Sequence, residues 1–197
     1  MKRIAYSFLL IALLCPAYGF AQGKIMYGVT AGVNLGSIID NYIPGRSIGI
    51  LAGLEIGYFN WDHYSVSIQA LYDQKGHTVY NSAPLLMNYL EVPITVKIPF
   101  TFSYSKFYFF AGPTIGFFLS SSSGEDAPLL DYGLYSGLGF TTPLNKDLDF
   151  VFEAGATLGF NNISHHPVFT GIITYTNDHS QDIRIQLGIL FGKEVIK

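Results

Sequence analysis

The sequence predicts an all-β protein, namely an eight-stranded antiparallel up-and-down β-barrel that crosses a membrane. The first observation is the alternation of apolar with small or polar residues. In residues 89–98 every second side chain is apolar, and the others include Glu91, Thr95 and Lys97. Successive side chains of a strand point to opposite faces, so such a segment has one apolar and one polar face. The second observation is that this pattern recurs along most of the chain, behind a segment typical of an export signal.

The first 21 residues have the features of a cleaved secretory signal peptide. Lys2 and Arg3 form a charged start, and residues 4–14 form a short apolar core. Residues 19–21 have the small-x-small pattern of a cleavage site, which predicts Gln22 as the first residue of the mature chain. The apolar run is too short to span a membrane comfortably, so a membrane anchor is disfavoured.

The mature chain, residues 22–197, is predicted to be one barrel domain. The only cysteine, Cys15, lies in the signal and follows Leu14 instead of the small residue that a lipoprotein signal needs, so no thiol or disulfide is expected. Without Lys2 and Arg3, 9 basic and 14 acidic residues remain, a balance that excludes the basic patch of a nucleic-acid-binding protein. Charged residues are 13% of the chain, about half the share typical of soluble domains. No mature stretch is apolar for the roughly 20 residues that a membrane helix needs, so a membrane-spanning form has to be a closed barrel.

Eight segments have the length and alternation of tilted barrel strands. They are residues 25–36, 48–59, 64–75, 87–100, 106–118, 131–142, 148–161 and 181–192. The connections after the second, fourth and sixth segments are short, and those after the first, third, fifth and seventh are longer. Short periplasmic turns and long external loops are the rule in outer-membrane barrels, and an even number of strands leaves both termini on the periplasmic side.

Alternation alone does not say which face is inside, because a soluble lipocalin-like barrel alternates with its apolar face inward. Two observations favour the membrane form. The polar face consists mainly of Gly, Ser and Thr with few charges, which suits a crowded interior. Aromatic residues also gather near the short turns, as in an interfacial girdle. The predicted girdle comprises Tyr58, Trp61, Tyr64, Phe100, Phe102, Tyr104, Phe107 and Phe150.

Residues 106–118 are the least regular segment, because residues 107–110 are aromatic on both faces. Pro113 in this segment and Pro93 in the preceding one each lack a donor for the strand ladder. A closed barrel has no free edge for them, so we expect a bulge or local kink at each proline.

A set of charged and amide side chains is predicted to point into the lumen. It comprises Glu55, Gln69, Glu91, Lys97, Glu153, Arg184 and Gln186. Small barrels have interiors filled by side chains, and buried charges need partners, so we expect an ion-pair network that plugs the lumen. A proton or ion path is the alternative. Glu91 and Lys97 lie six residues apart, roughly 20 Å along a strand, so each is expected to pair with other strands.

The external connections hold most of the histidines, His165, His166 and His179, and residues 120–126 supply serines and acids. A Ser, a His and an acid are the parts of a lipid hydrolase or acyltransferase, and a His cluster can bind a metal. Polar residues in a hydrated loop are the simpler interpretation, because no spacing fixes their geometry. No nucleotide-binding loop, zinc-protease helix or nucleophile elbow is present, so no cofactor and no metal are predicted.

Residues 89–97, Tyr-Leu-Glu-Val-Pro-Ile-Thr-Val-Lys, resemble the PorT-like outer-membrane β-barrel family of Bacteroidetes. Residues 28–34 are similar to the first strand of that family, and the Gly-rich residues 131–142 and 148–160 also fit. The resemblance implies an eight-stranded barrel in the outer membrane of a Gram-negative bacterium. The namesake takes part in type IX secretion and gliding. The chain departs from the usual barrel pattern in that Phe191 is not its terminal residue.

The expected function is that of a non-enzymatic outer-membrane barrel with a side-chain-filled lumen and four external loops that bind a surface ligand or partner. A passive channel is disfavoured, because eight strands leave no wide lumen. The alternatives are an outer-membrane lipid-modifying enzyme that uses the loop histidines, or a component of a secretion or gliding machine. The expected partners are outer-membrane lipid, the barrel-assembly machinery during insertion, and an unknown surface or periplasmic protein, without nucleic acid.

Cleavage of the signal peptide makes a direct prediction for the mature protein. After expression in a Gram-negative host, the intact mass of the membrane-bound protein should correspond to a chain that begins at Gln22, because signal peptidase recognises the small residues before it. An intact mass that still includes residues 1–21 would show that this segment is retained as an anchor.

Overall fold

The computed structural model describes residues 23–38, 46–77, 85–102, 105–122, 129–162 and 179–194, in which all regular structure is β-strand. The strands are β1 (Lys24–Ile38), β2 (Arg46–Phe59), β3 (Ser65–His77), β4 (Leu85–Phe102), β5 (Ser105–Ser121), β6 (Leu130–Asn145), β7 (Leu148–Asn162) and β8 (His179–Glu194). Each predicted segment lies within an observed strand, except that Tyr64 belongs to the turn before β3. Within the described residues, no helix is long and apolar enough to cross a membrane.

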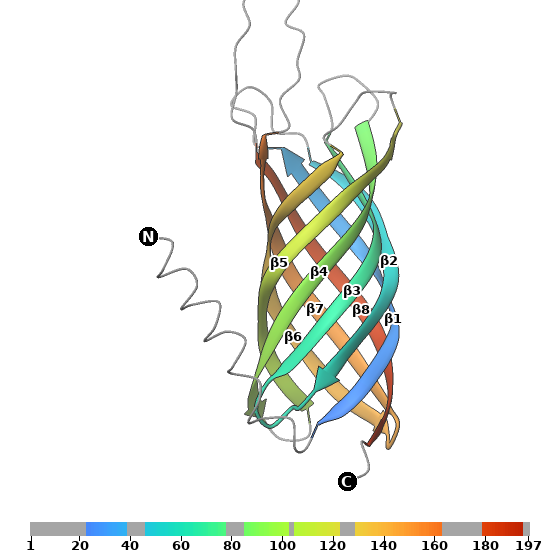
Figure 1. Cartoon of the computed structure of the whole chain (residues 1–197), viewed down its shortest axis with the longest axis vertical. Helices are drawn as coiled ribbons and strands as arrows, with labels where there is room; N and C mark the ends of the chain where they lie inside the picture. Colours follow the sequence, from blue (N-terminus) through green and yellow to red (C-terminus); the bar gives the residue numbers. More distant parts are fainter. Residues whose placement is uncertain are drawn as a thin grey trace, which may run out of the picture.

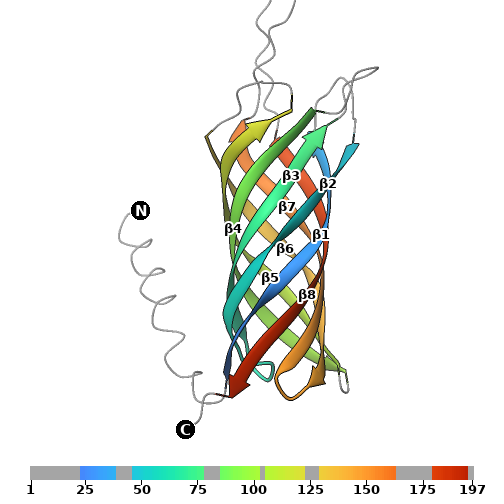
Figure 2. The same ribbon diagram turned by 90° about the vertical axis from the view of Figure 1, so that its right-hand side faces the viewer.

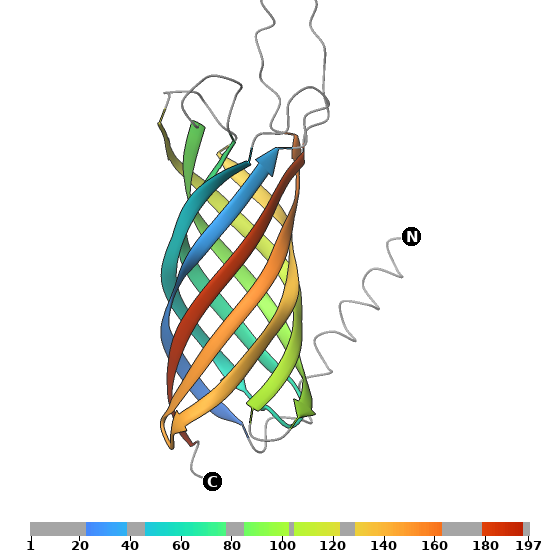
Figure 3. The same ribbon diagram turned by 180° about the vertical axis from the view of Figure 1, so that it is seen from behind.

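The eight strands form one closed barrel in which every strand pairs antiparallel with its neighbours in sequence. β1 also pairs with β8, from Lys24 opposite Glu194 to Ile38 opposite Ser180, so the first and last strands lie side by side and close the ring (Figure 3). The fold predicted from the alternation is therefore confirmed. Closure leaves no strand edge, so the ladder can satisfy the backbone donors and acceptors without water.

The strands are tilted strongly against the barrel axis (Figures 1 and 2). A path across the paired residues once around the ring returns to β1 ten residues farther along the strand. That path runs through Ile25, Tyr58, Val66, Val96, Ala111, Ser136, Ala156, Ile183 and Leu35. Such a stagger requires the tilt of roughly 35–45° that closed barrels have. Tilt lets side chains from distant strands meet at one level of the lumen.

The two faces of the sheet are inverted relative to a soluble protein. Leu54 is 63% exposed and Ile56 is 55% exposed on the outside of β2, whereas Glu55 between them is 4% exposed inside the barrel. The same alternation of exposed apolar and buried polar side chains holds in β1, β3, β4 and β8. An apolar exterior around a polar interior is the arrangement that hydrocarbon requires.

The start of β1, the end of β8 and the short turns lie at one end of the barrel. Lys24 at the start of β1 is opposite both Phe59, which precedes the first short turn, and Glu194 at the end of β8. The second short connection contains residues 103–104, and the third is the turn at residues 146–147. The four longer connections leave from the opposite end, and residues 39–45, 78–84, 123–128 and 163–178 lie outside the described structure.

Of the predicted bulge or local kink at each proline, the bulge is wrong and the kink stays a prediction. The pairs on either side of Pro93 and of Pro113 keep one register, so no residue is inserted at these positions. The shift in the β4–β5 ladder occurs instead between Asn88 and Tyr89, where Leu119 is the extra residue on β5. A strand tolerates the missing donor because the ladder bonds on both sides hold the register, whereas a bulge needs an additional residue.

Phenylalanines form a continuous belt on the outside of the barrel near the short turns. Neighbouring ring centroids are 4.7 Å apart between Phe100 and Phe109, 5.9 Å between Phe107 and Phe140, and 6.0 Å between Phe140 and Phe150. Of the predicted girdle, Tyr58 and Tyr64 are half-buried near the same end, and the side chains of Phe102 and Tyr104 lie outside the described structure. The belt marks where an aromatic surface meets the membrane interface.

Trp61 does not belong to this outer belt, contrary to the prediction. Its ring packs on Phe59 at 5.3 Å and on Tyr108 at 5.2 Å, and both of those rings are buried inside the barrel. The turn at residues 60–64 folds across the barrel mouth, so the indole covers the interior instead of facing lipid.

Because the apolar face points outward, the stability lost when an outward side chain is replaced by arginine should depend strongly on its depth in the membrane. Leu54→Arg at the middle of β2 should destabilise the barrel by about 2–4 kcal/mol in lipid vesicles, whereas Leu129→Arg at the rim should cost about 0–1 kcal/mol. Leu129 is the matched control, because it is 73% exposed at the end of the barrel. The measurement is the free energy of unfolding in denaturant, and equal losses for both variants would contradict the membrane orientation.

Candidate functional site

Among the described residues, the lumen contains nine charged side chains, each less than one-tenth exposed. They come from six strands and comprise Glu55, Asp73, Lys75, Glu91, Lys97, Asp131, Glu153, Asp182 and Arg184. Strand alternation points these side chains inward, and the tilt of the strands brings them together in two clusters at different heights. An isolated charge at such a position is very costly, so the contacts within each cluster decide whether the barrel is stable.

The lower cluster, nearer the short turns, is centred on Lys97 and is called the Lys97 cluster. Lys97 Nζ donates to Glu55 Oε1 at 2.6 Å and to Glu153 Oε1 at 2.7 Å. Glu153 also accepts hydrogen bonds from Tyr108 at 2.8 Å, from Gln69 at 3.5 Å and from Gln186. One lysine therefore ties β4 to β2 and β7 across the lumen, and the Glu153 carboxylate has four donors.

Aromatic rings cover the Lys97 cluster on the side of the short turns. Lys97 Nζ lies 5.4 Å from the ring centroids of both Phe59 and Tyr108. Cation–π attraction stabilises an ammonium that has lost its water. Met26 and Trp61 pack against the same rings, so this end of the lumen is closed by apolar side chains.

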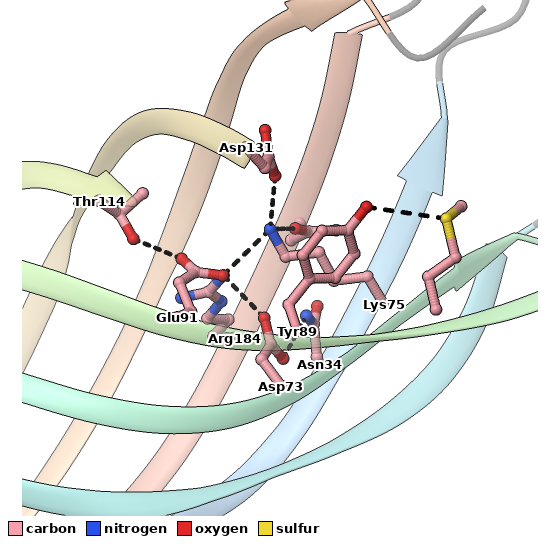
Figure 4. A network of polar contacts seen from close by, with 10 residues as sticks. Asn34, Asp73, Lys75, Tyr89, Glu91, Thr114, Asp131 and Arg184 are labelled. Carbon is pink, nitrogen blue, oxygen red and sulfur yellow. Dashed lines mark hydrogen bonds and ion pairs between the residues drawn. The ribbon is translucent and has the colours of Figure 1, made fainter. Parts of the chain in front are cut away.

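The upper cluster, nearer the long connections, is called the Arg184 cluster (Figure 4). Arg184 Nη2 donates to Asp73 Oδ2 at 2.9 Å and to Glu91 Oε2 at 2.6 Å. Glu91 also accepts from Thr114 at 2.6 Å, and Asp73 accepts from Asn34 at 2.8 Å. The guanidinium carbon lies 5.2 Å from the Tyr135 ring centroid, so this cation has an aromatic neighbour as well.

Lys75 completes the Arg184 cluster. Its ammonium lies 3.0 Å from Glu91, 3.0 Å from Asp131 and 3.5 Å from Asp182, so it occupies the point where carboxylates from three other strands converge (Figure 4). Tyr89 lies beneath it, with the ring centroid 5.2 Å from Nζ. No group of three or more His, Cys, Asp and Glu in the described part of the chain is placed to hold a metal ion.

The structure places all seven predicted lumen residues inside the barrel and divides them between the two clusters. The Lys97 cluster contains Glu55, Gln69, Lys97, Glu153 and Gln186. Glu91 and Arg184 belong to the other and contact each other. Glu91 and Lys97 do not pair with one another, in agreement with their six-residue spacing.

Sequence reasoning missed Lys75 and Asp131 as lumen charges and did not assign Asp73 and Asp182 to the network. The signal was present, because Lys75 follows Asp73 by two positions and so lies on the same face of β3. Lys75 and Asp131 stand at the ends of the predicted segments, where alternation no longer separates the lumen from the loops. Their burial depends on strands that extend beyond those segments.

The residues of the lipid-enzyme hypothesis fall largely outside the described structure. His165 and His166 lie in residues 163–178, and His179 is the first residue of β8 with a side chain that is not described. Ser120 stands on β5 and accepts a hydrogen bond from Asn88 at 2.9 Å. The Ser, His and acid arrangement stays a prediction.

The inverted faces and the charged, filled lumen define an integral membrane β-barrel. The chain belongs to the family described as the outer membrane protein beta-barrel domain, whose model matches residues 20–165. The protein is therefore an outer-membrane β-barrel protein. No protein of curated function matches the sequence.

Solved structures share this fold. OprG from Pseudomonas aeruginosa is 16% identical with a TM-score of 0.53, and the match covers 87% of this chain and 96% of that one. Neisserial surface protein A (NspA) is 14% identical with a TM-score of 0.53, covering 85% and 97%. The N-terminal β-barrel domain of Pseudomonas aeruginosa OprF is 13% identical with a TM-score of 0.51, covering 87% and 100%. At these identities the likeness concerns the fold alone.

The two clusters predict severe destabilisation when either central cation is removed. Lys97→Met leaves Glu55 and Glu153 without their cation. Arg184→Met leaves Asp73 without its cation and Glu91 with Lys75 alone, so each variant should cost about 3–5 kcal/mol. The measurement is the unfolding free energy in detergent micelles, together with the mobility shift between boiled and unboiled protein on gels. Unchanged stability and folding yield in both variants would refute the network.

The exposed pair at the first short turn is the matched control. Lys106 Nζ donates to Asp62 Oδ1 at 2.5 Å, and this contact lowers the pKa of the Asp62 carboxyl. The depressed pKa means that any stability from Asp62 is present above its unfolded pKa and is lost as the pH falls through the folded value. Lys106→Met should cost only about 0.2–1 kcal/mol, because water screens this pair.

Proposed function

We propose that this protein is a non-enzymatic outer-membrane mount, in which a closed, rigid barrel presents four external loops to a surface ligand or partner. The observation that carries the proposal is the filling of the lumen by buried ion pairs and aromatic rings at two heights. We infer that a lumen occupied in this way does not serve as a channel. Function then has to reside outside the lumen, in the segments that join the strands.

The proposed orientation places the chain ends and short turns in the periplasm and the long connections at the cell surface. Support comes from the chain ends and short turns sharing one end of the barrel, which is the arrangement of bacterial outer-membrane barrels. A signal peptide at residues 1–21 would deliver the chain to the periplasm for insertion by the barrel-assembly machinery.

Within the outer-membrane barrel family, we infer that the chain is PorT-like and derives from a member of the Bacteroidetes. The Tyr-Leu-Glu-Val-Pro motif supports this inference, and its position in β4 explains why those residues are needed. Glu91 of the motif contacts both cations of the Arg184 cluster, and Tyr89 lies beneath Lys75. The motif therefore supplies the carboxylate that connects β4 to β3 and β8.

The proposed closed lumen predicts that the purified protein does not conduct ions. Wild-type protein in planar bilayers should give no stepwise currents at neutral pH, because two layers of paired charges fill the lumen. A general porin in the same bilayers is the positive control. Stepwise single-channel currents from the wild type would overturn the closed-lumen proposal.

A second readout addresses the loops. A photocrosslinking amino acid at Thr170, in the longest external connection, should give adducts of defined mass on whole cells. The same group at Leu54 on the lipid-facing wall is the control and should give no protein adduct. No adduct from Thr170 or from a position in any of the other three connections would overturn the loop-binding proposal.

A further inference from the structure

We propose that the outer wall of β1–β5 carries a binding site for one outer-leaflet glycolipid, with a hydrogen-bonding site for an uncharged amino-sugar head and a groove for an acyl chain. The inference rests on the proposed orientation, which puts the upper end of the barrel at the cell surface. It concerns the lipid-facing wall and not the loops or the lumen.

The head site is a polar cluster on the outside of the barrel. Tyr72 donates to Asn88 Oδ1 at 2.7 Å, Gln74 donates to the same oxygen at 3.2 Å, and Asn88 Nδ2 donates to Ser120 at 2.9 Å. These four side chains come from three adjacent strands, and they stand where β3 and β4 approach the long connections. All four are uncharged, so the cluster offers hydroxyl and amide groups and no cation for a phosphate.

The cluster differs from the apolar exterior of other strands at the same end of the barrel. Ile48, Leu130 and Phe160 stand near the same end of β2, β6 and β7, and all three are exposed apolar side chains. The bulge between Asn88 and Tyr89 lies within this cluster and inserts Leu119 into β5 next to Ser120. Hydroxyl and amide groups at this height meet the head region of a lipid instead of its hydrocarbon.

The acyl-chain site is a groove of about 520 Å³ on the outside of the barrel. Two ridges of outward side chains flank it, and each ridge follows paired residues from β1 to β3. The ridges consist of Tyr27, Ile56 and Ile68 on one side, and Val29, Leu54 and Ala70 on the other. The floor is formed by Gly28, Glu55 and Gln69, the intervening inward-pointing residues.

The groove extends from Phe191 on β8 to Val92 on β4. Four strand spacings of about 4.8 Å give it a length of roughly 19 Å. It lies in the apolar band that faces the hydrocarbon region of the membrane, so lipid acyl chains are the groups that can fill it.

The groove and the polar cluster are continuous. Ala70 in the groove is followed two positions later by Tyr72, and Val92 is preceded by Leu90 and then by Asn88, all on the outward face. One lipid can thus place its head on the cluster while an acyl chain descends across β4 to β1. This continuity assigns both features to a single amphipathic occupant, and the uncharged head contacts favour an acylated amino sugar over a phospholipid.

The test is native mass spectrometry of the full-length protein with dephosphorylated lipid A, hereafter lipid A, as the probe, because its acylated diglucosamine head carries no charge. Phosphatidylethanolamine is the comparison lipid. The double variant Gln74→Leu/Asn88→Leu removes the head contacts, and Ala70→Phe fills the groove. Each should lower the ratio of lipid A-bound to free protein by about tenfold, the effect of losing one or two hydrogen bonds or the matching apolar contact. Gln181→Leu and Ala111→Phe, exposed residues outside the site, are the matched controls and should leave the ratio unchanged.

All five proteins should retain the gel mobility shift on boiling, because the substitutions face lipid. The proposal is overturned if lipid A binds equally to wild type and to both site variants. It is also overturned if the site variants lose phosphatidylethanolamine and keep lipid A, since the occupant is then a phospholipid. Neither result affects the loop crosslinks or the bilayer currents, so failure here is distinguishable from failure of the proposed function.

Discussion

The structure depends on one constraint, which is that backbone donors and acceptors in hydrocarbon must be paired within the protein. An antiparallel ladder satisfies them only if it closes, and β1 paired with β8 closes it. Closure fixes the rest of the design, because alternate side chains must then point either to lipid or into a narrow lumen. The apolar side chains cover the outside, and the polar side chains have to fit into the narrow lumen that eight strands enclose.

Burial in that space explains the form of the charged clusters. Each cation contacts at least two carboxylates and has an aromatic ring within 5.4 Å. The carboxylates outnumber the cations six to three among the charged lumen residues that the structure describes. Hydrogen bonds from neutral donors, such as those from Tyr108 to Glu153 and from Thr114 to Glu91, spread this excess of negative charge. The network joins strands that are not neighbours in the sheet, which makes the wall a rigid support.

The proposed function assigns different roles to the inside and the outside of the barrel. The lumen holds the barrel together, and we propose that ligand recognition falls to the loops and to the lipid-facing wall. The polar cluster of Tyr72, Gln74, Asn88 and Ser120 shows that the wall itself is not uniform. Under this proposal, the lipid-facing wall carries specificity for a ligand, although hydropathy alone would treat that wall as uniform contact with lipid.

The sequence by itself determined the barrel, the strand number and the two faces of each strand, because alternation with period two is a local property of the chain. The composition of the polar face and the aromatic residues near the short turns indicated which face is inside. It also placed five charges inside, because the residues before and after each of them in the strand are apolar and point to the other face. These charges are Glu55, Glu91, Lys97, Glu153 and Arg184. Only the tertiary structure decided which of these charges meet, because the partners are set by the ten-residue stagger around the ring. It likewise brought Lys75 and Asp131 into the lumen and turned Trp61 onto the buried rings, since strand extension and the path of a turn depend on neighbours far away in the sequence.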